Sequence, residues 1–486
     1  MHHRKPKHSM HSGHGTGGAA HRWLLPVLLV AQLMVILDIT AVNIALPHIA
    51  MDLKMSGSTI SWTITSYSLI FGSLLLFGGR AADLLGRRRM FLAGLGVFTA
   101  SSFASAMSGS AAMLFASRAG QGLGAAILSP AALSIVTSAF QGSQRAKALS
   151  AWGAVGGAGA AIGVLVGGVL TQFTDWRTIF YVNLPVAAAL LVASRKVVPA
   201  DTQKPRWRGL DLAGAALATT SLAAIVYGIT EVHSAGWTSI QTHVCGIGGV
   251  AGLAAFAIYE LHIDKPLLRV ERIADRAIGG GLVLMLAVAG TIFGLFLLSS
   301  LYLQNVLGWG PLATGLAFVP LALSAGIGSH AAGHLIGKHG VRGPLAGAFA
   351  VAAVGMFLLS RVGEHGSYAS DVLPGMLIAG TALGVATVSV SMAILTGTRQ
   401  EESGMISGLN STGHEIGGTL GIAIFSTIAA GSGAVLGPQA ASGIGNAFLI
   451  AALVASLAGV MALAILPRAQ HFLAKLALNP QAMPVH

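Results

Sequence analysis

Long apolar runs alternate with short polar turns along almost the whole chain. A helix of about 20 apolar residues spans a bilayer, and counting runs near that length gives fourteen predicted helices. The pattern therefore predicts an all-α integral membrane protein. The predicted spans are 24–46, 59–78, 90–109, 112–135, 148–171, 179–194, 211–230, 243–261, 278–304, 311–335, 343–360, 372–395, 412–432 and 442–466.

Composition agrees with this pattern. Of the 486 residues, 54% are hydrophobic and 9% are charged, whereas an ordinary soluble domain has about 25% charged residues. The net charge of +12 could suggest a nucleic-acid partner, but the basic residues lie between the apolar runs, where membrane topology requires them. We therefore predict no nucleic-acid binding. Cys245 is the single cysteine, so no intrachain disulfide can form.

The distribution of lysine and arginine orients the predicted spans. The loops on one side hold 24 of the 28 basic residues, while Lys54, Arg177 and Arg361 fall on the other side and Arg118 lies within a span. Positive residues favour the cytoplasmic side. Because the number of spans is even, both termini are expected to be cytoplasmic, in a multi-pass protein.

An internal repeat predicts the domain organisation. The segment 332–342, AGHLIGKHGVR, repeats the glycine spacing of 79–89, GRAADLLGRRR, so the chain looks like two six-helix halves with two helices inserted between them. Repeated halves with a site at their interface are typical of alternating-access transporters. The predicted parts are a disordered, His-rich cytoplasmic tail (1–22), an N-terminal half (23–195), a link with the inserted pair (196–277), a C-terminal half (278–467) and a cytoplasmic tail (468–486).

The turn at 79–89 predicts a charged latch between helices. Gly79 and Gly86 permit close backbone approach, and Asp83 can meet a helix N-terminus or an arginine, with Arg87 and Arg88 nearby. This segment resembles the GxLaDRxGRk loop of the major facilitator superfamily. The resemblance implies a major facilitator fold, and a loop whose contacts change as a transporter alternates between its inward-open and outward-open forms.

Asp38 lies well inside the first apolar run, in LDITAVNIALP. A carboxylate is expensive in hydrocarbon, so it should face the bundle interior or water and hold a proton readily. A structural aspartate bonded to a neighbouring helix is the alternative. The segment resembles the LDxTxVNVALP signature of the fourteen-span drug:proton antiporter family, which implies that Asp38 belongs to the proton-coupling residues.

Arg118 is the basic residue inside a span, in RAGQGLGAA. It shares a helix face with Gln121. An unpaired arginine here would be expensive, so an acidic partner is needed and Asp38 is the natural candidate. The segment resembles the RxxQGxGaa motif of the same superfamily, which implies a role in proton translocation. A purely structural ion pair stays open as an alternative.

Two glycine stripes predict close helix packing. Glycines recur at intervals of four, and this spacing lets a second helix pack backbone to backbone. The first stripe resembles the antiporter signature GxxxGPxxGG, except that Val164 stands in place of the proline. The stripes are Gly159, Gly163 and Gly167 in the fifth predicted span, and Gly413, Gly417 and Gly421 in the thirteenth.

Four further carboxylates stand at predicted span ends. Glu415 occupies a position where the family tends to carry glutamine; it is either a second proton site, a contact for a cationic substrate, or an interfacial carboxylate. Asp211 opens a span, where a helix N-terminus favours an acid. Glu231 and Glu260 close spans and are expected to face water.

Together these features predict a proton-driven exporter of drugs, antibiotics or other amphipathic or cationic molecules, in the plasma membrane of a bacterium. Its expected partners are a drug-like substrate, protons and the lipid bilayer, with no obligate protein partner, cofactor or metal. An exporter of one metabolite or of a metal complex, which could use the histidine tail, is the alternative. A membrane enzyme or sensor would need a clustered catalytic set or a soluble domain, and the sequence shows neither.

Overall fold

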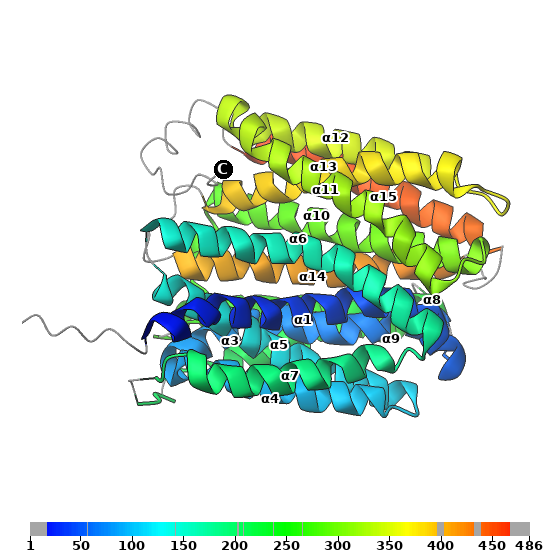
Figure 1. Ribbon diagram of the computed structural model, residues 1–486. Helices are drawn as coiled ribbons and strands as arrows, with labels where there is room; N and C mark the ends of the chain where they lie inside the picture. The colour runs from blue at the N-terminus through cyan, green and yellow to red at the C-terminus, as the bar shows by residue number, and fades with distance from the viewer. Residues whose placement is uncertain are drawn as a thin grey trace, which may run out of the picture.

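The computed structural model describes residues 17–55, 57–140, 142–201, 204–207, 209–236, 238–264, 266–395, 403–431 and 439–466, and throughout this part the chain is helical without strands (Figure 1). The helices are α1 (Gly17–Asp52), α2 (Gly57–Ile60), α3 (Trp62–Leu85), α4 (Arg87–Ala106), α5 (Ala111–Ala139), α6 (Gly142–Phe173), α7 (Thr178–Val197), α8 (Leu212–Ala235), α9 (Ile240–His262), α10 (Arg276–Leu301), α11 (Pro311–His339), α12 (Arg342–Leu359), α13 (Leu373–Leu395), α14 (Ser403–Ala430) and α15 (Ala440–Ile465), with short helical turns at Val270–Arg272, Tyr302–Val306 and Tyr368–Val372.

Eleven helices in the described residues are long and apolar enough to cross a membrane, so the chain is a multi-pass membrane protein. The long helices α4, α6 and α14 fall outside this set. Polar side chains lower the mean hydropathy of α4, and within the described side chains of α6 the apolar helix is Gly159–Phe173. The count of fourteen spans therefore stays a prediction.

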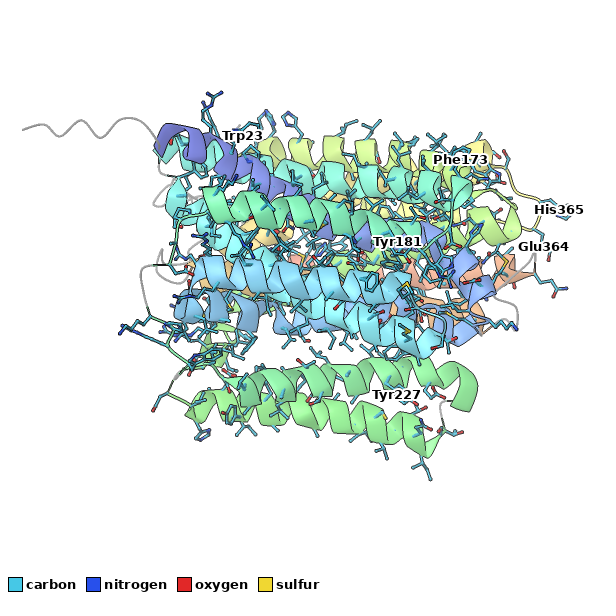
Figure 2. All side chains as sticks on the ribbon, turned by 60° about the horizontal axis from the view of Figure 1, so that its bottom comes forward. Trp23, Phe173, Tyr181, Tyr227, Glu364 and His365 are labelled. Atoms are coloured by element: carbon cyan, nitrogen blue, oxygen red, sulfur yellow. The ribbon has the colours of Figure 1, made fainter. Side chains whose placement is uncertain are left out.

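The helices gather into two groups (Figure 1). Helices α1, α3, α4, α5 and α7 lie together, and α10, α11, α12, α13 and α15 form the second group. Helix α6 packs against α1 and α11, while α14 packs against α10 and α3, so these two helices join the groups. The α8–α9 pair lies along one edge, where α8 contacts α14 and α3 (Figure 2). This arrangement has the form of two halves with an inserted pair.

The predicted tails fall largely outside the described residues. Residues 1–16 and 467–486 are not described, so the expected disorder and the histidine tail lie outside the structure's description. Helix α1 begins at Gly17, seven residues before the predicted start at Leu24. The apolar pattern marks where the chain can enter a bilayer, whereas helical hydrogen bonding continues into the polar residues before it.

Both glycine stripes face a neighbouring helix closely. On α6, a Cβ at Gly159 would fall 3.0 Å from Leu33 of α1, and a Cβ at Gly167 would fall 2.6 Å from the Cα of Ala41. Gly163 faces α1 between them. On α14, a Cβ at Gly417 would fall 2.6 Å from the Cα of Leu286 of α10. Gly413 and Gly421 face α10 as well.

Replacing Gly421 by alanine is expected to destabilise the α10–α14 contact, because the new Cβ would lie 2.7 Å from the carbonyl carbon of Gly290. Overpacking of this kind costs about 1–3 kcal/mol. Gly96→Ala in α4 is the matched control, because a Cβ there meets nothing within 4 Å. Both substitutions gain the same helix propensity from the change of glycine to alanine. Thermal unfolding of the purified proteins measures the difference, and equal unfolding temperatures for the two variants would contradict close packing at Gly421.

Candidate functional site

Asp38 of α1 and Arg118 of α5 form an ion pair in the interior of the bundle. Arg118 Nη1 donates to Asp38 Oδ2, and both residues are buried, at 1% and 0% exposure. A pair with no net charge is far less expensive to bury than either ion alone. The sequence expectation that these two side chains meet therefore corresponds to the observed geometry.

Neutral amides complete the coordination of the carboxylate. Gln121 Nε2 and Asn183 Nδ2 each donate to Asp38 Oδ1 at 2.9 Å. Gln121 Nε2 also lies 2.8 Å from Ser102 Oγ of α4, which is itself buried. Helices α1, α5 and α7 thus meet at one carboxylate, and α4 joins them through the contact of Ser102 with Gln121. Three donors, counting Arg118, surround the carboxylate.

Arg118 makes further contacts that fix its guanidinium. Its Nε donates to the carbonyl oxygen of Thr63 at 3.1 Å, and Nη1 donates to Gln121 Oε1 at 2.9 Å. The guanidinium lies 4.5 Å from the ring centroid of Tyr67 and 5.7 Å from that of Phe180. Two buried donors nearby have no partner, namely Arg118 Nη2 and the hydroxyl of Tyr67.

Glu415 lies on the other side of the interface between the two helix groups. It faces α3, where a Cβ at Gly72 would fall 2.8 Å from its own Cβ. Its side chain is 13% exposed, its Oε2 has no partner, and His414 Nδ1 lies 3.4 Å from Oε1. The hydrogen bonds found in the described residues do not join Glu415 to Asp38. Tyr67, however, lies within electrostatic range of Asp38, Arg118 and Glu415.

His414 connects Glu415 to an aromatic side chain. Its ring lies edge-on to Phe293 of α10, with 5.6 Å between the centroids. A carboxylate flanked by an imidazole and a phenyl ring, at the contact between α3 and α14, can attract a cation and pack against an apolar ring. This combination suits an amphipathic cation.

The predicted latch residues gather at the turn between α3 and α4. Gly86 has φ +109°, a conformation that side chains rarely adopt. Arg87 Nη2 lies 3.6 Å from Asp83 Oδ1, and both side chains are largely exposed. Arg88 Nη2 donates to the carbonyl oxygen of Arg195 at 2.7 Å. Gly79 faces α5, where a Cβ would fall 3.8 Å from Pro130.

Asp201 is a functional candidate that sequence reasoning missed. It lies in the link after α7, yet its Oδ1 and Oδ2 accept from the backbone N–H groups of Arg88 and Arg89 at 3.1 and 3.0 Å. A carboxylate in this position satisfies the first N–H groups of α4 and favours the helix dipole. The link is thereby tied to the latch turn. The available signal was a lone acid within a basic link.

Comparisons with known proteins agree with this geometry. The model of the Major Facilitator Superfamily matches residues 28–422. Puromycin resistance protein pur8 of Streptomyces alboniger is 39% identical over 414 residues, covering 84% of this chain and 82% of that protein. Cephamycin export protein CmcT of Amycolatopsis lactamdurans is 34% identical over 424 residues, covering 86% and 87%.

A solved structure shares the fold. The inward-facing, unoccupied structure of a bacterial homologue of the human lysosomal transporter Spinster superposes with a TM-score of 0.66 at 15% identity, covering 94% of this chain and 98% of that one. At this identity the likeness concerns the fold alone. The family model and the curated relatives go further, since both extend over most of the chain. The chain therefore belongs to the Major Facilitator Superfamily, as a multi-pass membrane transporter and not an enzyme.

Proposed function

We propose that this transporter is a proton-coupled antiporter that exports drugs, antibiotics or other amphipathic or cationic small molecules by alternating access. The names of similar proteins support drug export, among them a puromycin resistance protein, a cephamycin export protein and the multidrug resistance protein Stp of Mycobacterium tuberculosis. The observation that carries the proposal is the buried Asp38–Arg118 ion pair.

Protonation of Asp38 would change the charge balance of the site. A neutral carboxyl releases the ion pair and leaves Arg118 as an uncompensated buried cation, which is strongly unfavourable. The two unpartnered donors near it, Arg118 Nη2 and the Tyr67 hydroxyl, are the groups free to take new acceptors. A proton arriving at Asp38 would thus favour a rearrangement of α5 against α1 and α3.

Glu415 is proposed as the second titratable group, either for a proton or for a cationic substrate. Its position at the α3–α14 contact lets it respond when the two helix groups move, and it interacts electrostatically with Tyr67, as Asp38 does. A cation bound at Glu415 would oppose a proton there. Competition for one carboxylate is a simple way to couple two opposite fluxes.

The latch residues are proposed to control the change between the inward-open and outward-open forms. They are Gly79, Asp83, Gly86, Arg87 and Arg88. Their turn would lie at the cytoplasmic face, with both termini on that side and the protein in the bacterial plasma membrane. The exposed Asp83–Arg87 pair is weak, about 0–1 kcal/mol. A weak pair can exchange partners during each transport cycle.

Export in cells tests the proposal. Ethidium and puromycin accumulation should fall several-fold when the protein is expressed in a bacterium that lacks its own drug exporters, and a protonophore should abolish the difference. Unchanged accumulation of both compounds, together with an unchanged inhibitory concentration for a panel of neutral and cationic drugs, would contradict drug export.

Glu415→Gln is expected to reduce export of the cation ethidium about tenfold or more while export of an uncharged drug continues, because a charged contact contributes roughly 1.5–3 kcal/mol. The control is Asp264→Asn, because Asp264 is exposed. Asn410→Asp in the same helix is unsuitable, because the Asn410 amide donates a hydrogen bond to Ser391. Equal loss for charged and uncharged drugs would assign Glu415 to proton coupling and not to substrate charge.

A further inference from the structure

The inserted α8–α9 pair contains two buried carboxyl groups that the transport mechanism does not use. Asp211 is the N-cap of α8, where its Oδ1 accepts from the backbone N–H of Gly214 at 2.8 Å. The hydroxyl of Tyr259 in α9 donates to the same oxygen at 3.2 Å. Asp211 is 5% exposed. The expected role at a helix N-terminus is therefore filled by one of its two oxygens.

Glu260 does not face water, in contrast to the sequence expectation. It is 3% exposed although it stands in the last turn of α9. The chain folds back after α9, and the backbone N–H of Leu268 donates to Glu260 Oε2 at 3.0 Å. The returning segment covers the carboxyl group. A long-range contact of this kind has no signature in the helix pattern.

The remaining oxygens of the two carboxyl groups face one point. Asp211 Oδ2 and Glu260 Oε1 are both buried without a hydrogen-bond partner. A Cβ at Gly214 would contact Asp211 Oδ2 and would lie 2.6 Å from Glu260 Oε1. Only glycine leaves this space open, so the two orphaned oxygens converge above Gly214.

Two negative charges cannot share such a site without compensation. In the described part of the chain, neither carboxylate forms an ion pair, and Asp211 is the charged group that acts on Glu260. Among the described residues, the other charged side chains nearest to the pair along the chain are exposed, namely Lys204, Arg206, His262, Asp264 and Arg269. A proton between the two oxygens would supply this compensation.

The geometry points to a proton-binding site in which Asp211 and Glu260 share one proton. A bound metal would need about six oxygen ligands, and the described residues contain no group of three acidic, histidine or cysteine side chains suited to a metal. Asp211 accepts two donors and Glu260 accepts one. The proposed proton is carried by Glu260 Oε1 and would be donated to Asp211 Oδ2, the two oxygens left without a partner.

This site goes beyond the proposed antiport and is independent of Asp38. Its proton joins the start of α8 to the end of α9 and to the returning segment at Leu268. Loss of the proton would place two like charges in a buried position. Because α8 packs against α3 and α14, the ionisation state of the pair acts on the edge where the two helix groups meet.

Infrared difference spectroscopy of the full-length protein in lipid nanodiscs tests the site. The wild type is expected to show a protonated-carboxyl C=O band at neutral pH, lost at alkaline pH and shifted by carboxyl-¹³C glutamate. Asp211→Asn removes the like charge and Glu260→Gln removes the acid, so both variants should lack the band. Asp264→Asn, an exposed acid on the returning segment, should retain it.

Three outcomes would overturn the shared proton. The first is a wild-type spectrum without a glutamate-derived acid band at neutral pH. This outcome does not depend on whether any variant folds. The second is an identical band in Asp211→Asn, Glu260→Gln and Asp264→Asn. The third is removal of the band by Na⁺, K⁺ or Mg²⁺ at constant pH, since a displacing cation would make this a cation site.

Discussion

Replacing Asp38 by asparagine is expected to abolish proton-driven export. Asparagine keeps the size of aspartate and one acceptor oxygen for Gln121 and Asn183, but an amide donor replaces the oxygen that pairs with Arg118. It cannot take up or release a proton. Ethidium transport into inside-out proteoliposomes with an imposed pH gradient should fall to the level of protein-free liposomes.

Asp52→Asn is the matched control for this variant. Asp52 lies at the far end of the same helix, where it pairs with Arg177 at 2.9 Å and is 46% exposed. Removing a partly exposed pair has an effect of about 0–1 kcal/mol, so transport should continue. If Asp38→Asn transports as well as Asp52→Asn, Asp38 is a structural residue and the alternative interpretation of the ion pair is correct.

Replacing Arg118 by methionine is expected to have the largest effect on stability. The change leaves Asp38 as an uncompensated buried carboxylate, and breaking a buried pair in this way costs about 3–5 kcal/mol. Tyr67 and Thr63 also lose their contacts with the guanidinium. The measurements are the yield of monodisperse protein and its thermal unfolding temperature in detergent.

The double variant Asp38→Asn with Arg118→Met separates charge from packing. Removing both charges should recover much of the lost stability, because no unpaired ion remains buried. Transport should stay absent. A double variant as unstable as Arg118→Met alone would show that packing of the arginine stem, and not its charge, holds the helices together.

The Asp38–Arg118 pair was predictable because each residue alone is expensive in a bilayer. One acid and one base inside apolar runs leave few ways to satisfy both, so the sequence indicates the contact before the helices are placed. Asn183, which donates to Asp38, and Ser102, which accepts from Gln121, gave no such signal. A buried amide or hydroxyl can bond within its own helix, so sequence alone does not assign it to Asp38.

Contacts made by loops were beyond the reach of pattern reasoning. Asp201 caps α4 from a link more than 100 positions away, and Glu260 is covered by the segment that follows its own helix. Both depend on where the chain turns back. Periodicity fixes the helices and their apolar faces, but it contains no information about such returns.

The span count shows a similar limit. The fourteen predicted runs coincide with long helices, yet α4, α6 and α14 are not among the eleven helices of the described residues that are long and apolar enough to cross a membrane. Two of these, α6 and α14, carry the glycine stripes and join the two helix groups. Small and polar residues serve that packing and reduce the hydropathy by which a span is recognised.

Substrate-induced proton release tests the central claim most directly. Purified wild type and Asp38→Asn, reconstituted at equal density in weakly buffered proteoliposomes, are mixed with ethidium while a pH indicator records protons. The account predicts release from the wild type, diminishing as the medium becomes more alkaline, and none from Asp38→Asn. Release of equal size and equal pH dependence from both proteins would contradict it.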